Sequence, residues 1–453
     1  MLGMLGRLLG CAPPRSEAYV AAAAAFAPDE VAAIERQFHA RAAAAHAGGL
    51  DGAALAAWCG LAGAPAVLLD GLLAAVAGCG AEGDPGDGAP RGGGRGPPGV
   101  LVTLKDMVVS KALAERTDDE AAAQFAFRVL DPAGAGAVSR EHLASVMEAL
   151  LRLSLPEGAD AAAPAESAAA IAAGALAMAP SPSSAPAATL DLAAFRAWAA
   201  RAPAAKALLT RLLANLPRVD AGGAAPPRAL LLRPEWVWLL APGLAPDLRR
   251  EWRLLFSSAK HGASYSTFLS RLGDAAPTLL LVRDGGGRVF GGIAHAAWRK
   301  SGAFYGDYAN CVFTLLPQAC VYPASGINAN LQWCGVNFGE LPNGVGFGGQ
   351  QGNFGLWLDA SLETGHSRPN ATYASPSLST EQSFAVDAVE AWLLRPPDEE
   401  EEAAAAAAGA RGRGGAGQSI LTKVAREDQA LLELAGVAAN NRAAAGHEPL
   451  EEG

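Results

Sequence analysis

The sequence predicts an α+β protein, in which an N-terminal helical EF-hand-like module precedes an antiparallel β-sandwich with flanking helices and a C-terminal helix. In the first half of the chain, apolar residues recur at helical spacings of three and four, as at Val31, Ile34 and Phe38. From Pro277 onward the apolar pattern shortens to that of strands, and Gly-rich turns separate the runs. Low-complexity segments lie between these regions.

Composition shifts divide the 453 residues into segments of different predicted character. The predicted segments are a disordered tail (1–16), a helical degenerate EF-hand-like region (17–155), a low-complexity linker (156–188), a helical connector (189–225), the sandwich domain (226–395), a disordered acidic and Gly-rich insert (396–418), a C-terminal helix (419–438) and a second tail (439–453). The final helix has two open interpretations, since it packs either on its own domain or on a partner.

The net charge and the cysteine pattern limit the classes of function and the cellular compartment that the sequence allows. A net charge of -10 argues against a nucleic-acid binder, which would present a basic face. The six cysteines form neither a CxxC pair nor a zinc-ligand spacing, which favours a reduced, cytosolic protein. The apolar N-terminus is too short to span a bilayer, and Leu2 stands where myristoylation requires glycine. Cys11 is a palmitoylation candidate, or it lies in a disordered tail.

Residues 131–142 resemble the loop of an EF-hand with most of its calcium ligands missing. Asp131 fits the first ligand position and Gly136 the sharp turn. Ala133 and Ala135 replace oxygen ligands, and His142 stands where a bidentate glutamate belongs. We therefore predict a helix–loop–helix scaffold that holds no metal.

The predicted sandwich is built from short strands and a few helices. Pro246 and Asp247 are expected to open a helix that continues to Phe256, and Ser379 is expected to cap a short helix. Asp284 to Gly287 predicts a hairpin turn. Further strands are predicted at 311–315, 320–322, 331–336, 354–359 and 385–394.

The Gly-rich stretch from Gly344 to Asp359 is the most distinctive in the chain. Gly344, Gly346 and Gly349 satisfy the G-x-G-x-x-G pattern of dinucleotide-binding proteins. That pattern needs a strand before it and a helix after it, whereas an Asn-Gly turn precedes it here and another glycine-broken apolar run follows. We predict no cofactor, and interpret these glycines as turn and close-packing positions whose exposed loop forms part of a partner-binding edge.

Motifs spread over some 140 residues are similar to those of the TLDc domain family. They are Trp252–Ser258, His261–Ser264, Val289–Gly292, Gly348–Gly349, Phe354–Asp359, Gly365–Ser367, Leu378–Ser379 and Val389–Trp392. The degenerate EF-hand-like region before them and the helix after them resemble the mTOR-associated branch of that family.

The resemblance implies a two-sheet β-sandwich with no established catalytic centre. Family members are associated with resistance to oxidative stress and with the V-type proton ATPase, and this branch with lysosomes and mTOR signalling. The expected protein is therefore non-catalytic and cytoplasmic, and associates peripherally with a lysosomal or vacuolar membrane. Its expected partners are V-type ATPase subunits and mTOR pathway components.

Several polar residues are candidates for catalysis, since a catalytic triad needs a nucleophile, a base and an acid within hydrogen-bond reach. The candidates are His261, Ser264, Asp359, His366, Ser367 and Glu390. The alternative function is an oxidative-stress protein with redox or hydrolytic chemistry of its own, although Cys311, Cys320 and Cys334 lie in apolar strand contexts that favour a buried, structural thiol. The candidates for partner binding are His261, Gly349, Phe354, Trp357, Asp359, His366, Glu390, Leu431 and Leu432.

Overall fold

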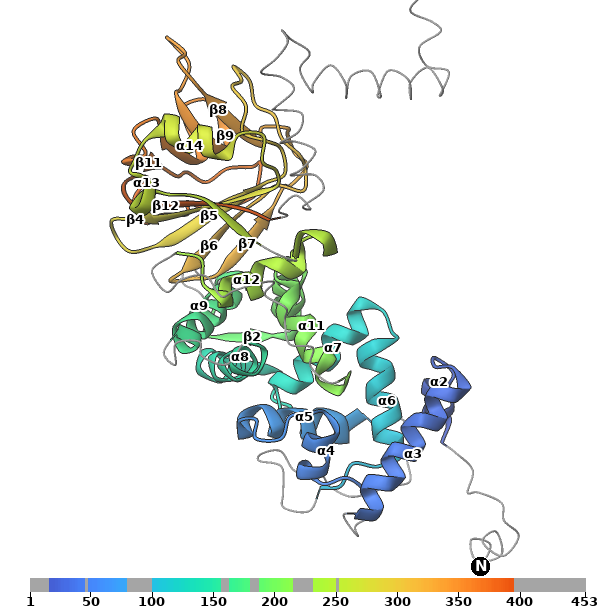
Figure 1. Ribbon diagram of the computed structural model, residues 1–453. Coiled ribbons are helices and arrows are strands. Elements are labelled where there is room, and N and C mark those ends of the chain that lie inside the picture. Colours follow the sequence, from blue (N-terminus) through green and yellow to red (C-terminus); the bar gives the residue numbers. More distant parts are fainter. Residues whose placement is uncertain are drawn as a thin grey trace, which may run out of the picture. The chain divides into compact units, whose positions relative to one another are not determined.

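The computed structural model describes residues 16–44, 48–79, 100–155, 163–179, 187–214, 231–249 and 252–394. Helices come first along the chain and an antiparallel sheet follows, which confirms the predicted α+β class (Figure 1). The predicted insert at 396–418, the helix at 419–438 with Leu431 and Leu432, and the tail at 439–453 lie outside the described residues.

The first helices begin where the sequence supplies capping groups. Their bounds are α2 Glu17–Ala23, α3 Pro28–Ala44, α4 Gly52–Trp58 and α5 Ala66–Cys79. The side chain of Ser16 accepts a hydrogen bond from the backbone N–H of Tyr19, and Asp51 does the same for Ala54. Helix α3 starts at Pro28, with two acidic residues in its first turn.

The next group contains the loop at 131–142 that was predicted to be EF-hand-like. Its elements are α6 Leu104–Glu115, α7 Asp119–Leu130, β1 Ala137–Ser139, α8 Arg140–Ser154, α9 Ala163–Ala177, β2 Thr189–Asp191, α10 Leu192–Arg201, α11 Pro203–Arg211 and η1 Leu212–Ala214. The Asp131 carboxylate accepts hydrogen bonds from the backbone N–H groups of Ala135 and Gly136, at 3.0 and 2.7 Å. Strand β1 pairs with β2 antiparallel, with Val138 opposite Leu190. The Asp131 carboxylate, which would be a calcium ligand in an EF-hand, is therefore hydrogen-bonded to backbone N–H groups of its own loop.

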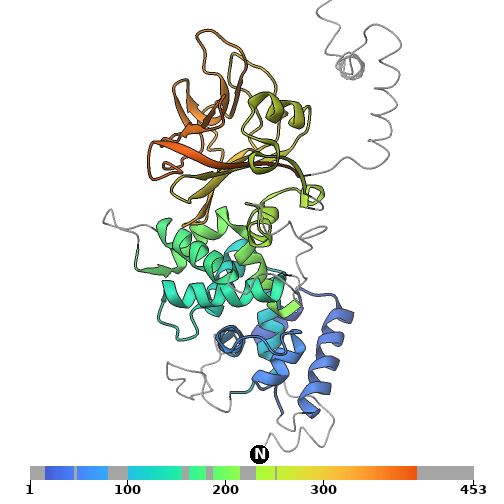
Figure 2. The same cartoon turned by 60° about the vertical axis from the view of Figure 1, so that its left-hand side comes forward.

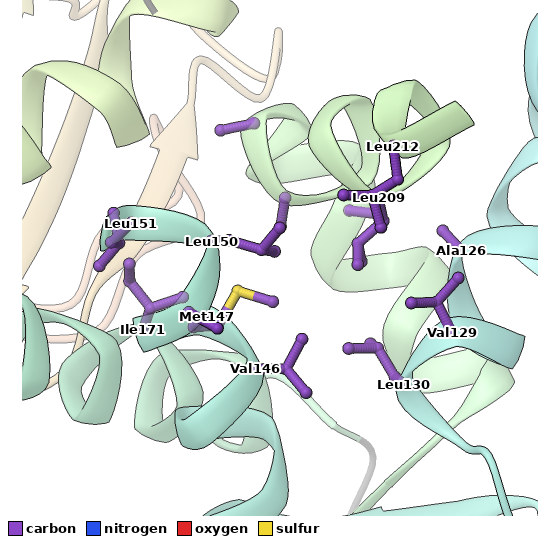
Figure 3. Close-up of a cluster of buried hydrophobic side chains, with 14 of the residues drawn as sticks. Ala126, Val129, Leu130, Val146, Met147, Leu150, Leu151, Ile171, Leu209 and Leu212 are labelled. Atoms are coloured by element: carbon purple, nitrogen blue, oxygen red, sulfur yellow. The ribbon is translucent and has the colours of Figure 1, made fainter. Parts of the chain in front are cut away.

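Helix α9 corrects the prediction of a linker at 156–188, because it lies inside that segment. Its alanines and Ile171 are buried, and Figure 3 shows Ile171 beside Met147 and Leu151 of α8. Alanine-rich composition resembles a linker, but small side chains also let two helices approach closely. Whether such a segment is a linker or a packed helix depends on the surface that it packs against. The composition of the segment does not reveal that surface.

The second half of the described chain forms the sheet domain. Its helices are α12 Pro234–Leu240, η2 Ala241–Gly243, η3 Pro246–Arg249, α13 Ser258–His261 and α14 Tyr265–Leu272. Its strands are β3 Arg253–Ser257, β4 Thr278–Asp284, β5 Val289–Ala294, β6 Cys311–Leu316, β7 Cys320–Pro323, β8 Gln332–Gly335, β9 Gly344–Gln350, β10 Asn353–Asp359, β11 Thr364–His366 and β12 Ser383–Leu393. The predicted hairpin is confirmed as β4 and β5.

The two layers of the predicted sandwich are both present and are joined through strand β12, which pairs with strands of both layers (Figure 2). The strand order is β7-β6-β5-β4-β12-β11-β10-β9-β8, and β3 also pairs with β12. The start of β12 pairs with β11, and its end, from Glu390 to Leu393, pairs with both β4 and β3. The layers face each other, since a Cβ on Gly292 of β5 would lie 2.8 Å from the ring of Phe347 on β9.

Two predicted helices are wrong. The helix expected from Pro246 to Phe256 ends after one turn as η3, and Arg253–Ser257 is strand β3. The leucines there fit the apolar spacing of a helix and that of a strand equally well. Pairing with β12 makes the segment a strand. Ser379 caps no helix, because its hydroxyl donates a hydrogen bond to the buried Asp284 carboxylate at 2.6 Å.

One hydrophobic core lies between the two layers, and a second joins the helices to the outer face of β4, β5 and β6. Helix α9 contacts the turn between β6 and β7 directly. The backbone N–H of Ala319 donates to the carbonyl of Ala170 at 2.9 Å. A Cβ on Gly174 would lie 2.0 Å from the Ala319 carbonyl oxygen, so only glycine allows this approach.

Candidate functional site

An aromatic cluster lies on the face of β8, β9 and β10 opposite the core between the layers. Trp333, Phe354 and Trp357 are buried there, covered by Phe304 and Leu341 from two loops. The rings of Phe354 and Trp357 stack at 4.4 Å, and Phe304 meets Trp333 edge-on at 5.2 Å. Because these rings already pack on one another, the cluster is a small core. Phe354 and Trp357, which were candidates for partner binding, are buried in it.

His366 belongs to the same cluster. It sits opposite Trp357 in the β10–β11 pair, and the two rings stack at 6.2 Å. Its Nε2 accepts a hydrogen bond from the backbone N–H of Phe354 at 3.4 Å. Burial and the nearby Arg368 lower the pKa of His366, which favours the neutral imidazole that this bond requires. The structure therefore brings three of the predicted residues together.

Gly349 and Asp359 lie toward opposite ends of the β9–β10 hairpin. Gly349 has a φ of 82°, and a Cβ there would lie 2.2 Å from the carbonyl oxygen of Asn353. The Asp359 carboxylate accepts hydrogen bonds from the backbone and hydroxyl of Ser361 and from the Thr364 hydroxyl. Partial burial acts to raise the pKa of Asp359, but these hydrogen bonds outweigh it and lower that pKa. Both residues shape turns.

The G-x-G-x-x-G glycines lie within strand β9, and strand β10 follows them. A dinucleotide site needs the N-terminus of a helix at that point to hold the pyrophosphate. Residues 344–366, all of which the structure describes, contain no helix.

His261 and Glu390 lie apart from the aromatic cluster, near the pairing of β3 with β12. The Nδ1 of His261 accepts a hydrogen bond from the backbone N–H of Ser257 at 3.1 Å. Desolvation, Arg271 and Lys260 lower the pKa of His261. These contacts close the turn after β3.

Glu390 is buried, with 3% of its surface exposed, and its carboxylate accepts three hydrogen bonds. The donors are the backbone N–H groups of Leu231 and Leu232, at 2.9 and 3.2 Å, and the indole of Trp392 at 3.1 Å. Burial raises the pKa of Glu390, although these hydrogen bonds oppose the shift. Glu390 thus anchors the segment before α12 to the sheet.

The candidate catalytic groups are each bonded to nearby structural groups. Ser264 caps α14 by accepting a hydrogen bond from the backbone N–H of Thr267. Ser367 is buried, donates to the carbonyl of Gly355 at 2.5 Å and accepts from the backbone N–H of Leu378 at 2.8 Å. These bonds hold the chain in place and do not join a serine, a histidine and an acid into a relay.

The strand cysteines lie in environments that suppress thiolate formation. Burial raises the pKa of Cys311 to about 12 and also raises those of Cys320 and Cys334. Peroxide chemistry requires an accessible, low-pKa thiolate. The five described cysteines form no disulfide.

We expect a thiol reagent to label the folded chain very slowly. With a pKa of about 12, only about one Cys311 side chain in 10⁵ is ionised near pH 7. Labelling of a Cys11→Ser chain should be followed in buffer and in denaturing urea, where all remaining thiols are accessible. Rapid labelling in buffer would contradict the structural role of these cysteines.

Two features of the domain were not predicted from the sequence: the hydrogen bonds of Asp284 and an exposed pair of loops. Asp284, predicted only as a turn residue, accepts hydrogen bonds from the backbone N–H groups of Gly286 and Arg288 as well as from Ser379. The second feature is the exposed loop pair, which we define as residues 305–310 and 324–331. The loops lie side by side, since the backbone N–H of Ala324 donates to the carbonyl of Asn310 at 3.2 Å.

The exposed loop pair carries two large, accessible side chains: Tyr308 is 57% exposed and Ile327 is 71% exposed. A large apolar residue isolated among polar turn formers, as in the run Ser325 to Asn330, is the sequence signal that could have revealed it. Among the described residues, no helix has the length and apolar character needed to cross a membrane. In the same ranges, no group of three or more His, Cys, Asp or Glu side chains is placed to hold a metal ion.

Comparison with known proteins agrees with this architecture. The TLDc domain model matches residues 228–395. MTOR-associated protein MEAK7 of Gallus gallus is 33% identical over 212 residues, which cover 46% of this chain and 42% of the relative. The Homo sapiens protein of that name is 35% identical over 196 residues, covering 43% and 40%.

A more distant relative is Oxidation resistance protein 1 of Rattus norvegicus. It is 32% identical over 168 residues, which cover 36% of this chain and 19% of the relative. The chain thus matches less than half the length of each of these relatives. Residues 228–395 form a TLDc domain, and the chain is a TLDc protein that resembles MTOR-associated protein MEAK7.

Proposed function

We propose that this chain is a non-catalytic regulatory protein whose TLDc domain binds and modulates the V-type proton ATPase on the cytoplasmic side of lysosomal or vacuolar membranes. Its likeness to an mTOR-associated protein and to an oxidation resistance protein supports a regulatory role. The association of the TLDc family with this ATPase supplies the partner, and mTOR pathway components are further partners.

The observation that carries the proposal is a contrast within the TLDc domain. Its polar candidates for chemistry are engaged in capping and backbone hydrogen bonds. The exposed loop pair, in contrast, presents Tyr308 and Ile327 to solvent. Large side chains that become buried at an interface contribute much of its binding energy. The domain is therefore better equipped to bind a surface than to transform a substrate.

The alternative, an oxidative-stress protein with its own chemistry, has less support in the site. Its thiols have raised pKa values, and its serines and histidines are not linked. If purified chain consumed peroxide, and serine at positions 311, 320 and 334 abolished the reaction, this alternative would replace the proposal.

We expect the intact chain to co-purify with V-type ATPase from native membranes, and Ile327→Asp to weaken that association about tenfold or more, because a charge at an interface anchor must be desolvated. Val20→Asp is the matched control, since Val20 is 55% exposed but lies on α2, outside the TLDc domain. A chain ending at Leu394 tests the contribution of the predicted C-terminal helix.

Failure of the intact chain to associate would exclude the ATPase proposal. Equal association of Ile327→Asp and Val20→Asp chains would exclude the exposed loop pair as the contact. Equal association of the intact and shortened chains would exclude a contribution from the final helix alone.

A further inference from the structure

The loop at residues 324–331 presents an exposed isoleucine although the loop contains no helix or strand. Ile327 is 71% exposed, and its backbone N–H donates a hydrogen bond to the hydroxyl of Ser325 at 3.2 Å. A flexible loop loses conformational entropy when a partner orders it, whereas a loop that is already ordered binds without that cost. The groups that hold this loop therefore determine how well Ile327 can serve as an anchor.

One later segment of the chain holds both ends of the loop. The backbone N–H of Ser325 donates to the carbonyl of Thr372 at 2.8 Å, and the hydroxyl of Ser325 donates to the carbonyl of Ala371 at 2.6 Å. At the other end, the hydroxyl of Tyr373 donates to the carbonyl of Leu331 at 2.7 Å. The two ends of the loop are therefore fixed to residues 46 and 42 positions later in the chain.

Thr372 joins the centre of the loop to strand β9. Its side chain is fully buried, and its hydroxyl donates to Oδ1 of Asn328 at 3.0 Å. The same hydroxyl accepts a hydrogen bond from the backbone N–H of Gly349 at 3.0 Å. Oδ1 of Asn328 also accepts from the backbone N–H of Asn330 at 3.0 Å, and the side-chain amide of Asn330 donates to the carbonyl of Gly349 at 2.7 Å. One buried hydroxyl thus connects Gly349 to the residue next to Ile327.

We propose that residues 324–331 form a pre-organised anchor loop for the partner of the TLDc domain, and that Thr372 is the positioning residue that keeps Ile327 presented. The inference rests on the proposed function for the identity of the partner. Because the ends and the centre of the loop are already bonded, Ile327 enters an interface at a low cost in entropy. Without the Thr372 hydroxyl, the N–H of Gly349 and the Oδ1 of Asn328 lose their common partner, and the loop samples other conformations.

Hydrogen exchange of the full chain, followed by mass spectrometry, tests this ordering. Thr372→Val removes the hydroxyl and keeps the size and branching of the side chain. We expect peptides that cover residues 324–331 to exchange about tenfold faster in this variant, and peptides from β4 to report any general loss of stability. Thr372→Ser retains the hydroxyl and should keep exchange slow.

Thr278→Val is the matched control, because the hydroxyl of Thr278 is also buried but accepts its hydrogen bond from the indole of Trp298. This variant should leave exchange at residues 324–331 unchanged. Equal acceleration there by Thr278→Val and Thr372→Val would overturn the positioning role, and so would unchanged exchange in Thr372→Val.

Quantitative co-purification of the same variants with V-type ATPase tests whether the ordering matters for binding. Thr372→Val should weaken association about fivefold although Ile327 is intact, whereas Thr372→Ser and Thr278→Val should bind as the intact chain does. Faster exchange in Thr372→Val with undiminished association would overturn the role of Thr372 and leave the proposed function in place. Absence of association by the intact chain would overturn the proposed function, and with it the docking role of the loop.

Discussion

Replacing Glu390 by alanine should lower the free energy of unfolding by about 3–5 kcal/mol, because it leaves several buried donors without an acceptor. The carboxylate accepts from the backbone of Leu231 and Leu232 and from the indole of Trp392. Urea denaturation followed by circular dichroism measures the loss. Glu381→Ala, at an exposed glutamate of the same domain, should change stability little. Equal effects of the two substitutions would contradict the anchoring role.

The pH dependence of stability, compared between the unmodified chain and Glu390→Gln, shows the effect of ionising the Glu390 carboxyl. Burial raises the pKa of the folded-state carboxyl above 4.5, so folding favours the protonated form. The stability that this raised pKa contributes is fully present below the pKa of Glu390 in the unfolded chain. It is lost as pH rises through the pKa of Glu390 in the folded chain. Relative to Glu390→Gln, the unmodified chain should therefore lose stability as pH rises from 4.5. A constant difference would show that this carboxyl titrates alike in both states.

Gly174→Ala should lower the free energy of unfolding by about 2–3 kcal/mol, although alanine favours helices over glycine by about 1 kcal/mol. The new Cβ would lie 2.0 Å from the Ala319 carbonyl oxygen and 3.0 Å from the sulfur of Cys320. Helix α9 must then move away from the β6–β7 turn, which breaks the hydrogen bond between Ala319 and Ala170. Urea denaturation should give a lower midpoint.

Gly78→Ala provides the matched control for this substitution. Gly78 also lies in a helix, α5, but a Cβ there meets no atom within 4 Å. Its replacement should raise stability by about 0.5–1 kcal/mol through helix propensity. If Gly174→Ala were as stabilising as Gly78→Ala, the close approach of α9 to the sheet domain would be wrong.

The parts of the fold that local chemistry determines could be predicted from the sequence. The turn from Asp284 to Gly287 specified its hairpin. The parts that distant pairing determines could not. Strand β3 carries an apolar run that also suits a helix, and β12, more than 130 residues later, makes it a strand. Helix α9 resembled a linker because its sequence is rich in alanine, and that composition does not indicate which surface the helix packs against.

The candidate site shows the same division. Phe354, Trp357 and His366 follow one another closely on a hairpin and its neighbouring strand, and the structure brings them together. Glu390 was predicted only as a candidate for chemistry or for partner binding. Two of its three hydrogen-bond donors are backbone N–H groups 158 and 159 positions away, which carry no signal in the sequence. The exposure of Ile327 likewise depends on how two loops meet.

Strand β12 has a consequence for how the chain folds during synthesis. It is the last strand of the described chain, and it pairs with β3, β4 and β11. Until the ribosome has released it, those three strands lack a neighbour and the cores on both sides of the β4 layer stay open to water. Such late, long-range pairing is slow and leaves strand edges exposed meanwhile. The TLDc domain therefore completes its sheet only after residue 393 has emerged, and the edges of β3, β4 and β11 that face β12 stay unpaired until then.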